Sequence, residues 1–283
     1  MRRWIILSFL ALGTVPSAAA AVEAAAADPR SSERGYAPIH RRAGYFAVAC
    51  GFSHRNQDDP IVYPRERGRS HDHTYFGNSS TNAFSTPASL RAAGRTTCRL
   101  PADTAAYWAP TLLIGGRAVE PLGAVVYYVR RTFARVQLFP AGLKVIAGDA
   151  AAQRPQSRRV TFWSCGERDA SSTVPTCPAY RGSSLRLTVN FPNCWDGRRL
   201  DSADHNSHMA YSSRGRCPSS HRAEVPAISV VIYYGVAGGR TAELASGGDF
   251  SGHADFVNAW DQRTLAALVD RYLNGFGYRF RHP

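Results

Sequence analysis

Short hydrophobic runs separated by proline and glycine recur along this chain. The runs are rich in β-branched and aromatic residues, which is typical of strands bounded by turns. In one run Leu185, Leu187 and Val189 alternate with polar residues, as expected for a strand with one buried face. The runs predict strands over 124–129, 136–139, 160–163, 185–189 and 228–234. Because helical periodicity is scarce, the pattern predicts a mainly β fold: an antiparallel β-sandwich or jelly-roll-like domain with long loops.

One segment near the C-terminus follows helical periodicity instead. Asp261 can cap its start, and Gly275 can end it. The apolar residues that share one face of this helix are Leu265, Leu268, Val269, Tyr272 and Leu273. The sequence shows neither an internal repeat nor a convincing linker, so we expect a single β-rich domain over 43–283 that ends in a C-terminal helix.

The first residues resemble an export signal. Arg2 and Arg3 precede a short apolar run, and small residues suited to a signal peptidase follow. We expect a secretory signal peptide over 1–21 and a flexible leader over 22–42, which is rich in alanine, arginine and serine. No later run approaches the roughly 18 apolar residues that a membrane span needs. The sequence therefore predicts a secreted, extracellular protein without a transmembrane segment.

Composition sharpens this picture only in part. The chain of 283 residues is 44% hydrophobic and carries a net charge of +13, which excludes disorder but leaves a basic surface to explain. Nearly all of the excess is arginine, since Lys144 is the single lysine. A compositional bias of the coding sequence explains this better than nucleic-acid binding does, and we expect no nucleic-acid partner.

Six cysteines remain after the signal, which is an even number, as expected for disulfides in an exported chain. Sequence alone allows 15 connectivities. We favour pairing in sequence order, because Cys165 with Cys177, and Cys194 with Cys217, would close short loops. Zinc–thiolate binding is less attractive, since the chain has no CxxC spacing.

Histidine and aspartate residues gather in three segments. His71 and His73 would share a face on an extended strand, although a hydrogen-bonded pair beside a turn would look the same. His253 and Asp255 have the same spacing, and the carboxylate could orient the imidazole or join it as a metal ligand.

The third segment runs from Cys194 to Tyr211 and combines carboxylates, imidazoles, an amide and a phenol. Helical spacing would bring His205 and His208 together, whereas an extended strand would separate them. A turn with a surface histidine cluster is the alternative to a functional loop here. If the three segments form one site, then His73, His205 or His208, and His253 should line one pocket.

These segments also carry a family resemblance. The stretches SHDHTYFGN, NAFSTPASL, NCWDGRRLDSADHNSHMAY and GHADFVNAWD resemble the family known as domain of unknown function DUF1996, over about residues 46–273. The resemblance implies an exported β-rich domain whose signature segments contain the three clusters. It implies no established catalytic role.

The density of titratable groups favours an enzyme that cleaves an extracellular or cell-wall polysaccharide by hydrolysis or elimination. The candidate catalytic residues are His73, Asp196, Asp204, His205, His208 and Asp255. Arg69, Tyr211 and Trp260 are candidates for substrate binding, and His71, His73 and His253 for a divalent transition metal such as zinc or copper.

The alternative is a non-catalytic glycan-binding or cell-wall protein. It would present aromatic rings on a flat face and leave the histidines dispersed. The candidate rings are Tyr45, Phe46, Tyr75, Phe76, Tyr107 and Trp108.

Overall fold

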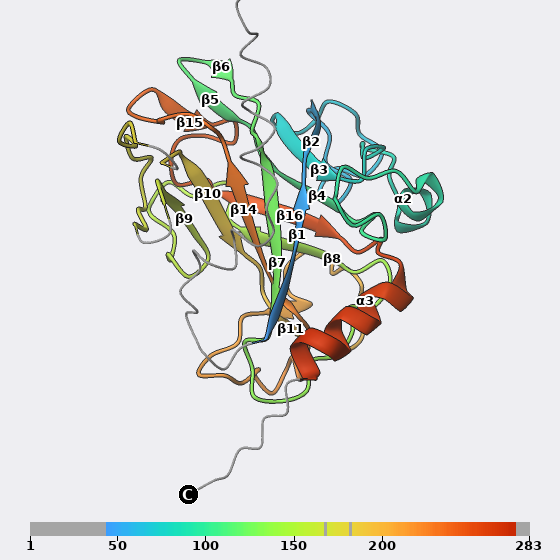
Figure 1. Ribbon diagram of the computed structural model, residues 1–283. Coiled ribbons are helices and arrows are strands. Elements are labelled where there is room, and N and C mark those ends of the chain that lie inside the picture. Colours follow the sequence, from blue (N-terminus) through green and yellow to red (C-terminus); the bar gives the residue numbers. More distant parts are fainter. Residues whose placement is uncertain (1–43, 167–168, 181–182, 276–283) are drawn as a thin grey trace, which may run out of the picture. The chain divides into compact units, whose positions relative to one another are not determined.

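The computed structural model describes residues 44–166, 169–180 and 183–275, and most of their regular structure is antiparallel β-sheet. Two five-stranded sheets form the framework (Figure 1). The first sheet has the order β1 (Tyr45–Cys50), β7 (Gly123–Val129), β14 (Ala227–Tyr233), β10 (Arg186–Asn190) and β9 (Thr161–Ser164). The second has the order β2 (Phe52–Asn56), β3 (His73–Gly77), β4 (Ala106–Pro110), β16 (His253–Val257) and β8 (Lys144–Gly148).

The core lies between these sheets. Alternate residues of both sheets, such as Val126 and Val230 from the first and Phe256 and Val145 from the second, join one hydrophobic cluster. Figure 1 shows the second sheet behind the first, with its strands running across it. The arrangement is the sandwich that the alternating pattern predicts.

Smaller elements complete the described part. One three-stranded sheet contains β12 (Met209–Ala210), β11 (Cys194–Trp195) and β13 (Ala223–Glu224), and another contains β15 (Ala242–Leu244), β5 (Leu112–Ile114) and β6 (Arg117–Ala118). The short helix α2 (Pro87–Ala93) has a capping box at Thr86, and the sequence interpretation missed it. No helix in the described ranges has the length and apolar character that crossing a membrane requires.

The C-terminal helix begins where the sequence predicts. Asp261 accepts a hydrogen bond from the backbone N–H of Thr264, α3 spans Gln262–Leu268, and a π-helical segment, η2, continues over Val269–Asn274 to Gly275. Leu265, Val269 and Leu273 are its buried residues. The predicted apolar face therefore packs on the core despite the change of helical form.

Four of the five predicted strands are confirmed, as β7, β9, β10 and β14. The prediction for 136–139 was wrong. Val136 and Phe139 are buried, but the backbone of this segment bonds to unrelated partners: Val136 N–H to the Asn274 side chain and Gln137 N–H to the carbonyl of Glu224. An apolar run that fills the core but forms no ladder of hydrogen bonds with one strand is a buried loop.

Three disulfides pair the cysteines in sequence order, as expected: Cys50–Cys98, Cys165–Cys177 and Cys194–Cys217. The predicted signal peptide and leader lie outside the described residues.

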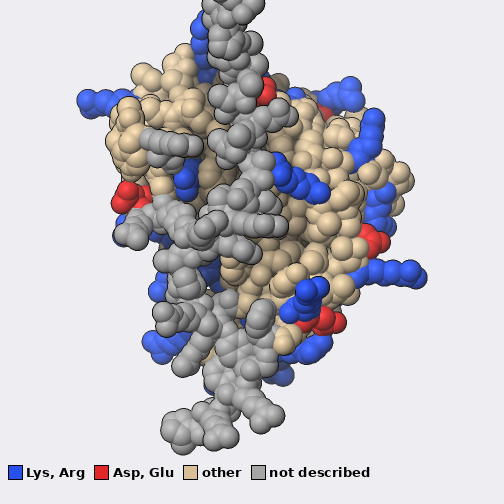
Figure 2. All heavy atoms as spheres, in the orientation of Figure 1, with Lys and Arg blue, Asp and Glu red and all other residues tan. Residues whose placement is uncertain are grey.

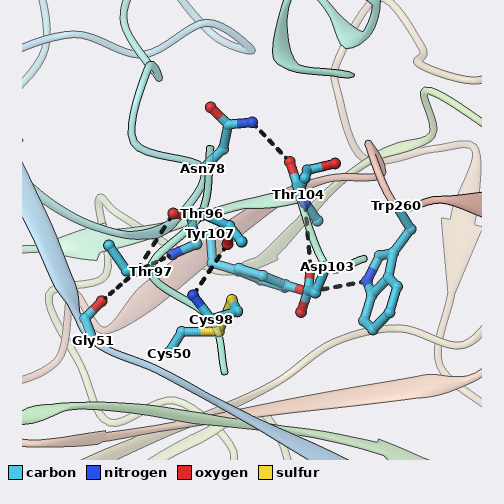
Figure 3. The surroundings of a disulfide bond; sticks show 12 residues. Cys50, Gly51, Asn78, Thr96, Thr97, Cys98, Asp103, Thr104, Tyr107 and Trp260 are labelled. Atoms are coloured by element: carbon cyan, nitrogen blue, oxygen red, sulfur yellow. Dashed lines mark hydrogen bonds between the residues drawn. A yellow bond between two sulfur atoms is a disulfide. The ribbon is translucent and has the colours of Figure 1, made fainter. Parts of the chain in front are cut away.

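Beside the first disulfide, a buried polar network links Asp103, Tyr107, Tyr128 and Trp260. Figure 3 shows Asp103, Tyr107 and Trp260 of this network next to Cys50 and Cys98. The Tyr107 hydroxyl donates to the Asp103 carboxyl at 3.0 Å, and the Trp260 indole N–H donates to the Tyr128 hydroxyl at 2.8 Å. This network fastens the start of the C-terminal helix to both sheets.

Candidate metal centre on the second sheet

Side chains with ligand atoms gather on the face of the second sheet that points away from the core. His73 begins β3, while His253 and Asp255 lie two residues apart on β16. Antiparallel pairing sets Asp255 opposite Trp108 of β4, so the two side chains share this face. Tyr107, next to Trp108, points into the core instead.

Two overlapping groups of ligand atoms share His73. The ligand atoms of His71, His73 and His253 lie within 4.8 Å of one another, and so do those of Asp59, His73 and Asp255. The two nearest ring nitrogens, Nε2 of His71 and Nε2 of His253, are 3.2 Å apart. We call these five residues the His/Asp cluster. Their spacing is short enough for one ion to contact several of them.

Hydrogen bonds fix how two of these imidazoles present their nitrogens. His73 Nδ1–H donates to the carbonyl of Asp58 at 3.0 Å, and His253 Nδ1–H donates to the carbonyl of Ser251 at 2.8 Å. In a neutral ring each Nε2 then carries a lone pair. Nε2 of His73 is buried without a hydrogen-bond partner. Backbone carbonyls orient metal-binding histidines in the same way.

The carboxyls reach the cluster from a loop and from a strand. Asp59 lies on the loop between β2 and β3, and its Oδ1 accepts the N–H groups of Ile61 and Val62 at 2.8 and 2.9 Å. Asp255 Oδ2 is buried with no hydrogen-bond partner among the described residues. The indole N–H of Trp108 is buried beside the Asp59 carboxyl, whose pKa it lowers. Buried polar atoms are nearly always satisfied, so the two acceptors left over, His73 Nε2 and Asp255 Oδ2, indicate a site for a ligand.

Burial dominates the electrostatics of the cluster. It raises the pKa of Asp59 and holds the pKa of Asp255 well above its usual value. It lowers the pKa of His71, lowers that of His253 to about 4, and holds that of His73 well below its ordinary range. Without a cation the buried carboxyls therefore favour their neutral form. A bound cation would reverse this preference, because it stabilises carboxylates at close range.

A second group of hydrogen-bonded polar side chains lies near the cluster. His205 Nδ1–H donates to Asp201 at 2.8 Å, and Lys144 donates to the other oxygen of the same carboxylate at 3.0 Å. His205 is half-buried and has a φ of 56°, which is uncommon for a residue other than glycine. It interacts electrostatically with Asp59. A carboxylate thus orients one nitrogen of His205 and leaves Nε2 for proton transfer.

The other predicted residues of this loop make hydrogen bonds and ion pairs that stabilise the loop itself. His208 is fully buried, with its ring nitrogens bonded to the Ser202 hydroxyl at 2.9 Å and the Lys144 carbonyl at 2.7 Å. Asp204 accepts N–H groups of its own turn, and Asp196 pairs with Arg199. His205 and His208 therefore separate, because the loop is a series of turns that buries only one of them. Of the two, only His205 interacts with a member of the cluster, through its electrostatic interaction with Asp59, and the prediction of one shared pocket stays a prediction.

The predicted substrate-binding residues lie in three different environments. Arg69 is exposed and pairs with Glu66. Tyr211 is 42% exposed, while its hydroxyl donates to the carbonyl of Asn190. Trp260 has no exposed surface, so the expectation that it stacks on a sugar is corrected: it belongs to the core network.

Most rings considered for sugar stacking are buried as well. Only Tyr45 is exposed, whereas Phe46, Tyr75, Phe76, Tyr107 and Trp108 are in the interior. The flat aromatic face that would indicate a simple glycan-binding module is not formed by these residues.

A cleft of about 330 Å³ runs beside β8. Two of the residues that line it, Ile146 and Gly148, lie on β8. There they pair with Asp255 and His253 of β16. Its lining is mixed in polarity: Ile146, Gly148, Asp149, Gln156, Val160, Pro192, Asn206, Met209 and Tyr211. The cleft brings Tyr211, and Asn206 beside His205, to the same edge of the sheet.

The sequence interpretation missed Asp59, and it considered Trp108 only as a ring for sugar stacking. Asp59 stands in the run Asp58-Asp59-Pro60, which reads as an ordinary turn. Its place depends on Ile61, which is buried in a small cluster on this sheet face and draws the loop over it. No local pattern reports such a long-range contact.

The fold and the cluster define a β-sandwich protein with a buried histidine–aspartate site on one sheet face. The chain belongs to the family described as "Domain of unknown function (DUF1996)", which matches residues 59–260. The match begins at Asp59 and ends at Trp260, and so contains the whole His/Asp cluster. No match was found among curated proteins or among solved structures.

Proposed function

We propose that the chain is an exported enzyme that cleaves an extracellular polysaccharide by hydrolysis or elimination, with a divalent transition metal held by the His/Asp cluster. The observation that carries this proposal is the convergence of three imidazoles and two carboxyls around buried atoms that have no partner. Mixed nitrogen and oxygen ligands suit zinc and other first-row divalent ions.

The metal would supply Lewis-acid polarisation of a substrate oxygen or an activated water. Proton transfer falls to His205, because Asp201 fixes its tautomer and Lys144 holds Asp201 in place. Of the cluster, His71 is the least buried member, so substrate approaches from its side. The cleft beside β8 leads along the same sheet edge.

An extracellular substrate fits the remaining evidence. The three disulfides are stable in an oxidising compartment, and the N-terminal pattern is that of a secretory signal. The cleft is open and carries amide, carboxylate and phenol groups together with apolar surface, as sugar rings require.

The first test is metal content. Untagged protein is loaded with a mixture of zinc, copper, manganese, iron and nickel salts, desalted and analysed for metals. We expect about one equivalent of one metal in the wild type and in His221→Ala, which removes a surface imidazole that bonds only to Ser220 and Ser207. We expect loss of that metal in His73→Ala. Less than about a tenth of an equivalent in the wild type contradicts a metal centre.

The second test is a polysaccharide panel run with and without chelator. New reducing ends report hydrolysis, and unsaturated ends report elimination. His205→Ala should lower kcat/KM by about 100- to 10,000-fold while metal content stays unchanged. Asp201→Asn should reproduce part of this loss. Full activity of both variants on every substrate that the wild type cleaves would overturn the assignment of His205.

A further inference from the structure

The loop that delivers Asp59 to the cluster also carries a row of arginines. Arg65, Arg67 and Arg69 alternate with Glu66 and Gly68, and all three arginines are exposed. Figure 2 shows basic side chains on the side where α2 lies in Figure 1, as well as elsewhere on this face of the molecule. The row places three arginines within five residues of one loop.

Two of these guanidinium groups lie over aromatic rings. The guanidinium carbon of Arg67 is 5.6 Å from the ring centre of Phe84, and that of Arg69 is 5.1 Å from the ring centre of Tyr63. Phe84 is 55% exposed, which is unusual for a phenylalanine. A guanidinium held over a ring by a cation–π contact loses side-chain freedom, which lowers the entropic cost of binding an oxyanion.

The buried side chain of Asp58 holds this surface in shape. Its Oδ1 accepts the N–H of Gly68 at 2.9 Å, and its Oδ2 accepts the N–H of Ala83 at 3.0 Å. Arg65 N–H donates to the carbonyl of Ala83 at 2.7 Å. Asp58 therefore joins the arginine loop to the segment of Phe84, while its own carbonyl orients His73. The arginine surface and the His/Asp cluster are parts of one rigid unit.

Acidic neighbours compensate this surface only partly. Arg69 pairs with Glu66, and Arg55 pairs with Asp72. Within the described part of the chain neither Arg65 nor Arg67 forms an ion pair, so both can bind an anion without breaking one. Arg69 is two residues from His71, the member of the cluster nearest to solvent.

We infer that Arg65, Arg67 and Arg69, with Tyr63 and Phe84, bind an anionic polysaccharide whose carboxylate or sulfate groups reach the guanidinium edges while sugar rings pack on the aromatic faces. The inference rests on the proposed function in one respect: it names the substrate class of the same site. Neutral glucans lack the oxyanion that three guanidinium groups recognise.

The test measures binding of the chelator-treated full chain to polygalacturonate, dextran sulfate and dextran at low ionic strength. We expect binding to one or both anionic polymers and none to dextran. The triple variant R65Q/R67Q/R69Q should lose about tenfold in affinity, and Phe84→Ala about threefold. Preference for polygalacturonate identifies uronate as the ligand, and preference for dextran sulfate identifies sulfate esters.

The matched control is R117Q/R131Q/R240Q, which removes the same charge from exposed positions on other elements. It should lose less than about twofold. Equal losses in both triple variants, or equal binding of dextran, would overturn the inference. Metal content separates the two proposals: R65Q/R67Q/R69Q keeps its metal, whereas His73→Ala loses metal and still binds the anionic polymer.

Discussion

Tyr107 and Trp108 are neighbours on β4, yet they belong to two different clusters of buried polar side chains. Tyr107 belongs to the core network, where its hydroxyl bonds to Asp103 and Tyr128. Trp108 faces the His/Asp cluster, where its indole N–H lies beside the Asp59 carboxyl. Strand geometry sends adjacent side chains to opposite faces, so one strand separates the two.

The core network and the His/Asp cluster differ in how many of their polar atoms have hydrogen-bond partners. In the core network the hydroxyls, the carboxyl and the Trp260 indole bond to one another. In the cluster His73 Nε2 and Asp255 Oδ2 have no hydrogen-bond partner among the described residues. An unsatisfied buried polar atom costs about 1–3 kcal/mol. A closed network stabilises the fold by itself, whereas an open one gains its stability when a ligand arrives.

The largest predicted effect is therefore in the closed network. Trp260→Ala removes a fully buried indole and leaves two hydroxyls without its N–H, and it should lower the free energy of unfolding by about 3–5 kcal/mol. Urea unfolding measures the change. The loss should be equal with and without chelator, and a loss that appears only in the presence of metal would contradict the distinction between the two groups.

The contribution of the His/Asp cluster to stability should, in contrast, depend on metal. At a free metal concentration of 100 times the Kd, the wild type should gain about 2.7 kcal/mol in unfolding free energy. His253→Ala should gain none, because it removes one ligand, while His221→Ala should gain as much as the wild type. Thermal unfolding with and without metal measures this. An equal gain in His253→Ala would place the metal elsewhere.

This contrast also separates what the sequence could predict from what it could not. The spacings His71-x-His73 and His253-x-Asp255 predict shared faces, and the structure confirms this for the β16 pair and brings the rings of His71 and His73 to 4.2 Å. The period of a strand is local information. That both pairs meet on one sheet depends on β4 lying between β3 and β16, which is a matter of topology.

The sequence could not predict which loop residues join the cluster, for a related reason. Asp59 enters the cluster because Ile61 is buried against the sheet, and His208 leaves it because its ring bonds to the Lys144 carbonyl. The same holds for the segment 136–139, whose apolar residues predicted a strand but fill the core from a loop. Alternation and spacing identify faces of regular elements, while long-range contacts decide where loops place their side chains.

The core network predicts a pH dependence that one residue carries. Burial raises the pKa of Asp103 to about 8, against an ordinary value of 3.8 in the unfolded chain. Between these values the folded protein holds one more proton than the unfolded chain at this residue. Its contribution to stability is complete at acidic pH and falls by about 1.4 kcal/mol per pH unit as the pH rises toward 8.

Asp103→Asn tests this dependence, since the amide is neutral at every pH. The difference in unfolding free energy between wild type and variant should shift against the wild type by about 1.4 kcal/mol per unit between about pH 5 and pH 7. Chelator in both samples keeps the cluster constant. Parallel pH profiles would show that Asp103 is ionised in the fold.

The smallest effect on the metal-free protein is expected from Asp255→Asn. Burial raises the pKa of this carboxyl well above its usual value and so favours its neutral form, and its Oδ2 has no hydrogen-bond partner among the described residues. A neutral amide of the same size therefore changes little. In chelator we expect a change below about 0.5 kcal/mol in unfolding free energy. With metal the same substitution should abolish most of the stabilisation, because an amide does not replace a negatively charged ligand. A large loss in chelator would mean that Asp255 is a structural residue like Asp103, and the contrast between the two sides of β4 would disappear. A small loss in chelator together with a large loss in metal would show that the unsatisfied carboxyl is kept for the ion.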